Sequence, residues 1–239
     1  MEEGTRDVGA DELRVKTEVF QSAKEPFTGR LLIGTPSRGT IRMEWHQARI
    51  GQIIPINWSM VTIMESLGGY VAQGFLVAEA QNLIIAKAMA GDFEWLLLYE
   101  DDMLPPADAF IKLNQYMMDE KYPVVSGLYC GKTVPTEWLT FRGRGNGSFR
   151  DWEIGDKEIW VDGVPTGFLL VHMSIMKAMW EDCEPYEIQG IQARRMFRFP
   201  RDLWEDPETH FYRTLMGTSD LDWSTRLIEG DYLKKAGWD

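Results

Sequence analysis

Residues 94–106 of this chain read EWLLLYEDDMLPP, an apolar run that ends in three consecutive acids and a proline-containing turn. A short apolar run bounded by turn residues predicts a strand that is buried on both faces. Ligand sites in open α/β sheets lie just beyond the carboxyl ends of the strands, where Glu100, Asp101 and Asp102 fall. Hard divalent cations bind carboxylates and phosphates together. The stretch therefore predicts a metal site for a phosphorylated ligand, with a solvated acidic turn as the simpler alternative.

Strand and helix patterns alternate around this stretch. We expect strands from Arg30 into a turn at 35–39, at 58–64 and at 123–129, and helices at 43–52, 76–90 and 107–120. Apolar residues recur with a period of 3.6 over 76–90, and Gly91 follows as a natural helix end. This alternation predicts an α/β fold with a mostly parallel central sheet flanked by helices.

The pattern changes after residue 130. We expect a long Gly- and Arg-rich loop over 131–156, two strands at 158–164 and 167–172 that form a small antiparallel portion, and a helix at 174–181 that Ser174 caps. Residues 184–213 are rich in Arg, Pro and aromatics and predict an irregular segment, and 218–235 predict a final helix. Residues 1–29 are polar without clear periodicity, so we divide the chain into a lead-in, 1–29, and one domain, 30–239.

The composition excludes several classes of protein. The chain has 239 residues, 44% of them hydrophobic, and a net charge of −12. A chain this acidic is a poor nucleic-acid partner, because such binding relies on Lys and Arg that neutralise phosphates. Two cysteines, Cys130 and Cys183, are too few for a disulfide scaffold. The three histidines lack the spacing of a zinc site.

The chain shows no sign of membrane insertion or export. It contains no run of the roughly 18 apolar residues that a transmembrane helix needs. Its N-terminus lacks the basic-then-apolar pattern of a signal peptide. We therefore expect a cytoplasmic protein without a transmembrane segment, with attachment to the periphery of a membrane as an additional option.

The strand with its acidic triplet resembles the metal-binding DxD region of GT-A-fold glycosyltransferases, particularly the inverting family 2 type. The first acid is Glu100 here, where the family has Asp. The resemblance implies a single GT-A-type domain, in which Glu100 and Asp102 bind Mn²⁺ or Mg²⁺ and Asp101 contacts the nucleotide sugar. It also implies that the antiparallel portion lies on the acceptor side.

Two further segments match the donor side of this family. The turn after the first strand contacts the nucleotide in the family, and here it consists of Thr35, Pro36, Ser37 and Arg38. An ordinary turn capped by Ser37 is the alternative. Asn82 matches the Asn of an Ala-Arg-Asn run on the helix before the acidic strand, and Gln81 replaces its Arg.

On the acceptor side, Gly167 and Phe168 match a Gly-Phe pair that precedes aliphatic residues in the family. Glycine there lets the backbone approach a sugar closely. A bulged strand pair explains the same residues without a ligand. The two readings are left open.

The general base is expected at the start of the last helix. The family carries an acid pair there, and Asp220 matches its Asp while Ser219 replaces its Glu. The helix dipole keeps such an acid ionised and able to accept a proton. Asp222 is the second candidate, and simple capping of the helix by Ser219 or Asp220 is the non-catalytic alternative.

Two expectations concern the rim of the site. Arg195, together with Arg194 or Arg198, could close over the diphosphate, although an exposed basic loop explains these residues equally well. A His beyond the acid-pair helix often completes the metal site in the family, and this sequence ends at Asp239 where that segment would begin. Either the natural protein continues or the His is not used, so we assign no third metal ligand.

The resemblance implies metal-dependent transfer of a sugar from a nucleoside-diphosphate-sugar donor to a hydroxyl of a glycan, lipid or protein, with inversion. A nucleotidyltransferase that forms a sugar nucleotide is one alternative, although residues 35–39 lack its expected glycine density. A non-catalytic carbohydrate- or partner-binding domain of the same fold is the other. The chain contains no Walker loop, GxSxG elbow or dinucleotide GxGxxG.

Overall fold

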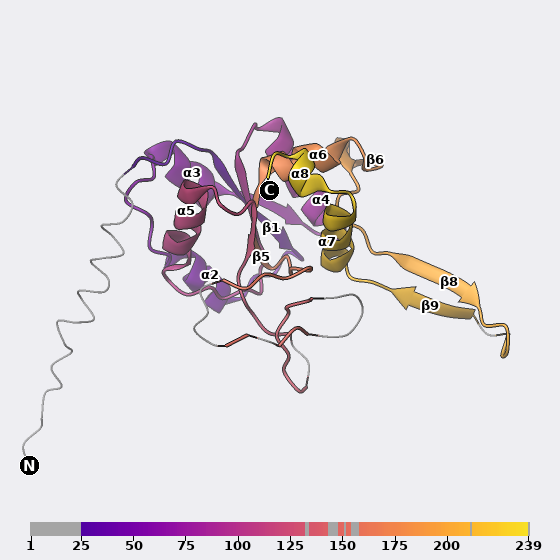
Figure 1. Ribbon diagram of the computed structural model, residues 1–239. Helices are drawn as coiled ribbons and strands as arrows, with labels where there is room; N and C mark the ends of the chain where they lie inside the picture. The colour runs from indigo at the N-terminus through magenta and orange to yellow at the C-terminus, as the bar shows by residue number, and fades with distance from the viewer. Residues whose placement is uncertain are drawn as a thin grey trace, which may run out of the picture.

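The structure is a computed structural model that describes residues 25–131, 134–142, 148–150, 152–153, 158–210 and 212–238. A five-stranded sheet flanked by helices forms its centre (Figure 1). The strands lie in the order β2-β1-β3-β5-β4. Their bounds are β1, Leu31–Ser37; β2, Tyr70–Gln73; β3, Trp95–Tyr99; β4, Val124–Ser126; and β5, Phe168–His172.

The sheet is mixed, where the sequence predicted a mostly parallel one. β1 pairs in parallel with β2 and β3, whereas β5 pairs antiparallel with both β3 and β4. β5 is therefore the one reversed strand of this sheet, and it lies between two strands that run the other way. The reversal arises because the chain leaves β4 at its carboxyl end and returns into β5 at that same edge.

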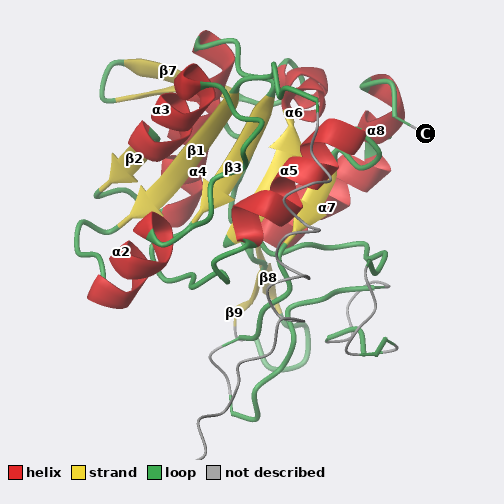
Figure 2. Cartoon of the chain, turned by 90° about the vertical axis from the view of Figure 1, so that its left-hand side faces the viewer, coloured by secondary structure: helices red, strands yellow, loops and turns green. Residues whose placement is uncertain are grey.

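Helices cover both faces of the sheet (Figure 2). One face is packed by α4 (Val77–Ala90), α6 (Met173–Trp180), α7 (Ser219–Glu229) and the short α8 (Tyr232–Lys235). The opposite face is packed by α2 (Met43–Ile50), α3 (Met60–Gly68) and α5 (Ala109–Asp119). The predicted helices 43–52, 76–90, 107–120 and 174–181 are confirmed within a few residues at their ends. The predicted cap Ser174 is wrong, because His172 caps α6 and its Nδ1 accepts the N–H of Ser174 at 3.3 Å.

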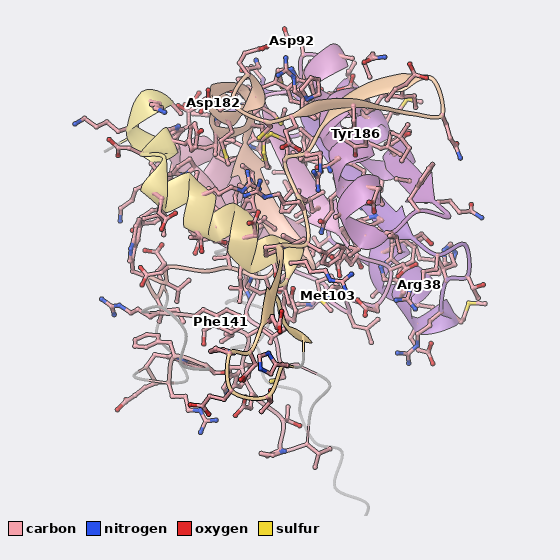
Figure 3. All side chains as sticks on the ribbon, turned by 90° about the vertical axis from the view of Figure 1, so that its right-hand side faces the viewer. Arg38, Asp92, Met103, Phe141, Asp182 and Tyr186 are labelled. Carbon is pink, nitrogen blue, oxygen red and sulfur yellow. The ribbon has the colours of Figure 1, made fainter. Side chains whose placement is uncertain are left out.

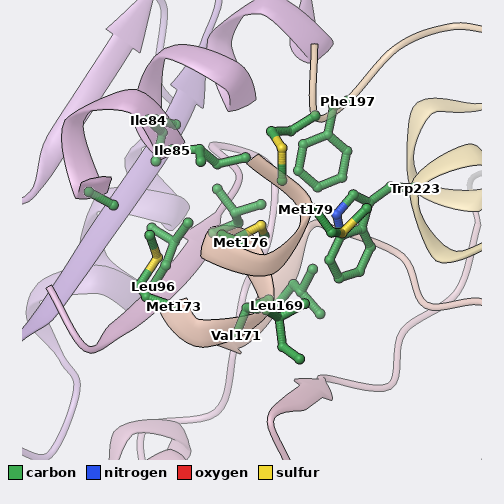
Figure 4. Close-up of a cluster of buried hydrophobic side chains, with 14 of the residues drawn as sticks. Ile84, Ile85, Leu96, Leu169, Val171, Met173, Met176, Met179, Phe197 and Trp223 are labelled. Carbon is green, nitrogen blue, oxygen red and sulfur yellow. The ribbon is translucent and has the colours of Figure 1, made fainter. Parts of the chain in front are cut away.

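The core explains why the decisive stretch is continuously apolar. Leu96 and Leu98 of β3 join the cluster beneath α4 and α6, which Figure 4 shows, while Trp95, Leu97 and Tyr99 join the cluster on the other face. Alternate side chains of a strand point to opposite faces. Because both faces are covered, every residue of β3 is buried.

The predicted strand at 58–64 is wrong. Trp58 makes an isolated bridge to Phe27, and α3 begins two residues later. The side chain of Ser59 accepts a hydrogen bond from the backbone N–H of Thr62 at 3.0 Å, which caps the helix. Phe27 is buried in the core beside Trp58, so the end of the predicted lead-in contributes to the fold.

The segment 184–213 was expected to be irregular but contains two hairpins. β6 (Pro185–Ile188) pairs with β7 (Ile191–Arg194), and β8 (Arg201–Glu205) pairs with β9 (Tyr212–Met216). The second hairpin projects away from the sheet (Figure 1). The first hairpin turns at Gln189 and Gly190, both of which have positive φ.

Two other predictions need correction. Residues 158–164 form no strand and contribute a single bridge between Gly163 and Phe141. The predicted helix 218–235 is broken at Gly230 and Asp231, where Asp231 has φ of 53°. The predicted loop 131–156 is described only in part, and residues 143–147 lie outside the described ranges.

Candidate functional site

Glu100 follows β3 directly, and its backbone is fixed from three directions. Its N–H donates to the carbonyl of Gly167 at 2.8 Å. Its carbonyl accepts from the indole N–H of Trp45 on α2 at 2.8 Å and from the N–H of Met103 at 3.2 Å. The acidic turn is therefore held by hydrogen bonds to the segment before β5, to α2 and to a residue of the turn itself.

The side chain of Glu100 meets two polar groups from other elements. Its Oε1 lies 3.4 Å from Thr166 Oγ1 and 3.4 Å from Gln81 Nε2. Gln81 Nε2 also donates to Thr166 Oγ1 at 2.9 Å. Gln81 and Thr166 are both buried, and Gln81 Oε1 has no hydrogen-bond partner among the described residues. The carboxylate therefore sits on a buried polar platform built from α4 and the segment before β5.

The pKa of Glu100 is raised from 4.5 to about 7, chiefly because burial removes water from the carboxylate. The neighbouring charge of Asp102 raises it further, while the hydrogen bond from Thr166 lowers it. Smaller increases come from Asp220 and Asp101. The structure thus gathers Glu100, Asp101, Asp102 and Asp220 into one acidic cluster, although Asp220 lies more than a hundred residues from the others.

Tyr129 forms one wall of this cluster. Its hydroxyl accepts the N–H of Gly167 at 2.7 Å. The pKa of Tyr129 is raised, first by burial and then by the charge of Glu100, with Asp220 and Asp102 adding to it. A Cβ atom at position 167 would lie 2.5 Å from Tyr129 Oη and 2.8 Å from Met103 Sδ. Glycine is therefore required there by close packing against Tyr129 and Met103.

The two candidate bases at the start of α7 differ in their surroundings. Asp222 bonds to Arg226 Nε at 2.7 Å and to Arg198 Nε at 3.2 Å, and its side chain is almost buried. Its charge is compensated by two guanidinium groups. Asp220 instead lies near enough to the acidic cluster for its charge to raise the pKa of Glu100. One of its oxygens accepts from the adjacent N–H of Leu221 at 2.9 Å.

The segment Thr35–Arg38 lies at the same edge of the sheet as the acids. Thr35, Pro36 and Ser37 belong to β1 and are buried, so the turn begins later than predicted. Parallel pairing places Gly34 level with Leu98. The same register continued by two residues places Pro36 level with Glu100. Arg38 is exposed, and Figure 3 shows it at about the level of Met103, both well separated from Asp92.

Asn82 connects α4 to the segment after β7. Its Nδ2 donates to the carbonyl of Phe197 at 2.9 Å, and its Oδ1 accepts the N–H of Phe197 at 2.8 Å. The side chain is buried. Because both ends of the amide are used in this way, the structure gives Asn82 a role in holding the chain that is independent of any nucleotide.

Arg195 has an acidic partner outside the acidic cluster. It bonds to Glu184 at 2.7 Å, and it lines a cavity of about 310 Å³ together with Arg198, Arg226 and residues of the α7–α8 turn. Arg194 and Arg198 also have acidic partners, Glu181 and Asp222. The three arginines of the expected lid are thus all engaged in ion pairs.

The acids fit a divalent cation only in part. Within the described ranges, no three or more His, Cys, Asp and Glu side chains are arranged as a ready set of metal ligands. The pKa of Glu100 is nevertheless raised, because burial and then the neighbouring charge of Asp102 disfavour its ionised form. Mg²⁺ typically uses one or two carboxylates and takes its other ligands from phosphates and water. Glu100 and Asp102 fit that partial role.

Sequence reasoning missed three members of the site. Tyr129, Thr166 and the buried Gln81 all contact Glu100 or its neighbours, and none was assigned a role. Tyr129 comes just after β4 and Thr166 just before β5. Residues at the ends of neighbouring strands meet at one edge of a sheet, so their positions carried the signal once the sheet order was known.

Comparison of the chain with protein-family models, with curated proteins and with solved structures finds no match. The function is therefore inferred from the geometry of the site and the chemistry of its side chains. None of the helices in the described parts of the chain is both long and apolar enough to span a membrane.

Proposed function

We propose that this protein is a metal-dependent glycosyltransferase that transfers a sugar from a nucleoside-diphosphate-sugar donor to a hydroxyl acceptor. The observation that carries this proposal is the convergence of Glu100, Asp102 and Asp220 at the carboxyl edge of the sheet. Burial of the Glu100 carboxylate, together with the charges of Asp102 and Asp220, raises its pKa to about 7. Carboxylates gathered at the carboxyl edge of a sheet suit a hard divalent cation and the diphosphate that it would bind.

The roles of the residues follow from their surroundings. Glu100 and Asp102 would hold the cation, which supplies stabilisation of the negative charge that develops on the departing nucleoside diphosphate. Asp220 accepts the proton of the acceptor hydroxyl. The acceptor oxygen then forms a bond to the anomeric carbon while the bond from that carbon to the diphosphate breaks, and a single displacement of this kind inverts the configuration. Asp222 is less suited to be the base, because two arginines hold it.

Thermal unfolding with a panel of nucleotides tests the donor site. A ligand that binds only the folded protein raises the unfolding midpoint by mass action. We expect one of UDP, GDP, CDP or ADP, or its sugar conjugate, to raise the midpoint only when Mn²⁺ or Mg²⁺ is present. Asp102→Ala should abolish this stabilisation while the protein without ligand stays folded. Arg195→Ala should leave it unchanged, because the guanidinium of Arg195 is already paired with Glu184.

The products separate the proposed activity from its alternatives. A glycosyltransferase releases nucleoside diphosphate when an acceptor hydroxyl is supplied. A nucleotidyltransferase instead releases pyrophosphate from a nucleoside triphosphate and a sugar phosphate. Binding of a sugar without either release indicates a non-catalytic domain. Metal-independent nucleotide binding, or stabilisation that survives Asp102→Ala, would contradict the assignment of the metal site.

A further inference from the structure

The helix α3 has its polar and apolar faces reversed relative to an ordinary surface helix. Met60, Val61, Met64 and Leu67 point outward, and Met64 is 70% exposed. Thr62 and Ser66, in contrast, are 4% and 0% exposed. Surface helices normally turn their apolar stripe inward. The inward polar groups are satisfied locally, since Ser66 Oγ donates to the carbonyl of Ile63 and the Thr62 hydroxyl bonds to Ser59.

The edge strand β2 continues this apolar surface. Ala72 points into the core beneath α4, so its neighbour Val71 points to the opposite face of the sheet, the face that α3 covers. Val71 is 53% exposed. Among the described residues, none pairs with the outer edge of β2. The strand contains no charged residue or proline, which are the usual means of protecting an edge from other strands.

Charge is almost absent from this part of the chain. Residues 51–78 contain a single charged side chain, Glu65, although 26% of the whole chain is charged. Glu65 is itself paired with Arg30 at 2.5 Å. Depletion of charge with enrichment of Met is typical of the core of a protein–protein interface. A helix that lies on an anionic membrane needs Lys or Arg on its polar side, and the sequence has neither between Arg49 and Lys87.

We propose that α3 and β2 form the interface of a dimer of this chain. We call the surface made by Met60, Val61, Met64, Leu67 and Val71 the α3–β2 face. Antiparallel pairing of β2 with β2 of a second copy is compatible with a two-fold axis, which is the commonest symmetry of soluble dimers. The same axis brings the outward face of α3 against that of its copy, so one interface covers both the open edge and the exposed apolar residues.

The size and charge of the surfaces favour a second copy. A specific interface buries about 800 Å² on each partner, which a four-residue strand cannot supply alone and a neighbouring apolar helix can extend. Two chains that each carry a net charge of −12 repel each other. The α3–β2 face is nearly free of charge, so the approach of two copies is least opposed there.

Molecular mass in solution tests the dimer. We would measure it by light scattering and sedimentation equilibrium for the wild type, for Met64→Glu on α3 and for Val71→Lys on β2. The matched control is Ile228→Glu, which places a charge on an exposed apolar residue of α7 on the other side of the sheet. We expect dimers for wild type and control. Each face variant should raise the dimer dissociation constant by about 100-fold or more, because like charges meet across the axis.

Chemical cross-linking provides a second measurement, in which a covalent dimer appears rather than an existing dimer being lost. We expect Val71→Cys to give a covalent dimer with a short bismaleimide, and Ile228→Cys to give only the background of the native cysteines. Circular dichroism and the unfolding midpoint of each variant establish that it is folded. Since both substituted positions are exposed, their folding does not depend on the residues that are replaced.

Four results would overturn the proposal. One is a wild type that stays monomeric from about 1 µM to about 100 µM, the range in which useful dimers form. Another is a dimer that Met64→Glu and Val71→Lys leave intact. The third is a monomer that binds phosphatidylcholine–phosphatidylglycerol vesicles through this face and loses binding in Met64→Glu, which assigns the face to a membrane. A monomer that dimerises only after removal of residues 1–24 would assign it to that segment instead.

Discussion

Glu100 is held by the fold in a place where burial disfavours the charge of its side chain. Its backbone is fixed by Gly167, Trp45 and Met103, so the carboxyl group cannot move far from the acidic cluster. Burial and Asp102 both disfavour its charged form, and the hydrogen bond from Thr166 only partly offsets them. The fold therefore holds this side chain in a position where its charged form is disfavoured.

Because the pKa of Glu100 is raised, the free energy of unfolding depends on pH. The variant Glu100→Gln removes this dependence, since glutamine does not titrate. The folded pKa of about 7 lies above the ordinary value of 4.5, so the folded protein binds a proton that the unfolded chain has released. The contribution of Glu100 is therefore fully present below about pH 4.5 and is lost as the pH rises through 7. We expect Glu100→Gln to be more stable than the wild type at pH 8, by on the order of 2 kcal/mol.

Urea unfolding of both proteins at pH 5 and pH 8 measures this difference, which should be smaller at pH 5. Glu44→Gln, on an exposed side chain of α2, controls for the loss of one carboxylate elsewhere. Addition of Mn²⁺ at pH 8 should stabilise the wild type and leave Glu100→Gln unchanged. A variant that is less stable than the wild type at pH 8 would show that the charge of Glu100 is already compensated.

Asp220 and Asp222 are separated by a comparison of their amide variants. Asp220→Asn should keep metal-dependent donor binding and lose transfer by about 100-fold or more, the usual contribution of a general base. Asp222→Asn should instead lower the unfolding midpoint, because Arg198 and Arg226 lose their shared partner. The rate of sugar transfer and the unfolding midpoint of both variants distinguish these two roles. Retained transfer in Asp220→Asn would move the base to another residue.

At the scale of elements, Asn82 joins the middle of α4 to the segment that follows β7. Removing its amide in Asn82→Ala leaves the N–H and carbonyl of Phe197 buried without these partners. Each such loss costs about 1 to 3 kcal/mol, so for two losses we expect the free energy of unfolding to fall by about 2 to 6 kcal/mol. Gln47→Ala, at an exposed position of α2, is the matched control and should change little.

Donor binding by the same variant separates the two roles of Asn82. If the side chain only holds the chain, Asn82→Ala that is still folded should keep metal-dependent stabilisation by nucleotide. Unchanged stability with loss of that stabilisation would instead place Asn82 against the donor, as the resemblance implies.

The elements that could be predicted are those with a strong periodic or apolar signal. The helix α4 and the strand β3 follow directly from spacing and from a run that is buried on both faces. The strand predicted at 58–64 failed because a single cap, Ser59, decides that the apolar residues after it become helical. The hairpin of β6 and β7 was missed because its turn uses Gln189 as well as Gly190 at positive φ, which no familiar turn pair signals.

The acidic cluster was predictable where residues carry charge at the end of an element. Glu100, Asp102 and Asp220 could be named in advance for this reason, and the structure brings them together. Tyr129 and Thr166 could not, because their contacts depend on the insertion of β5 beside β3, which no local pattern encodes. The contacts of Asn82 and Arg195 could not be predicted either, because their partners, Phe197 and Glu184, are not adjacent to them in sequence.

At the scale of the whole molecule, an excess of acids opposes folding. The chain carries 37 acidic and 25 basic residues, and compact states concentrate that excess charge. Salt screens such repulsion over about 10 Å at 0.1 M. We expect the unfolding midpoint to rise when the ionic strength increases from about 0.01 M to about 0.15 M.

NaCl and KCl should have the same effect, because screening does not depend on which monovalent cation is present. A difference between the two salts would indicate specific ion binding, and a falling midpoint would show that attractive ion pairs outweigh the net charge. Measurement at one fixed protein concentration keeps any change in association out of the comparison.

The reversed strand β5 also sets the order in which the protein can be completed. During synthesis, β1 to β4 leave the ribosome before β5, yet β5 lies between β3 and β4 in the finished sheet. The gap between those two strands therefore stays open until residues 168–172 have been made, and closing it requires contacts between segments far apart in sequence, which form slowly. A nascent chain that ends before this strand already carries the acidic turn but lacks Thr166 and Gly167, so the site matures only in the last third of translation.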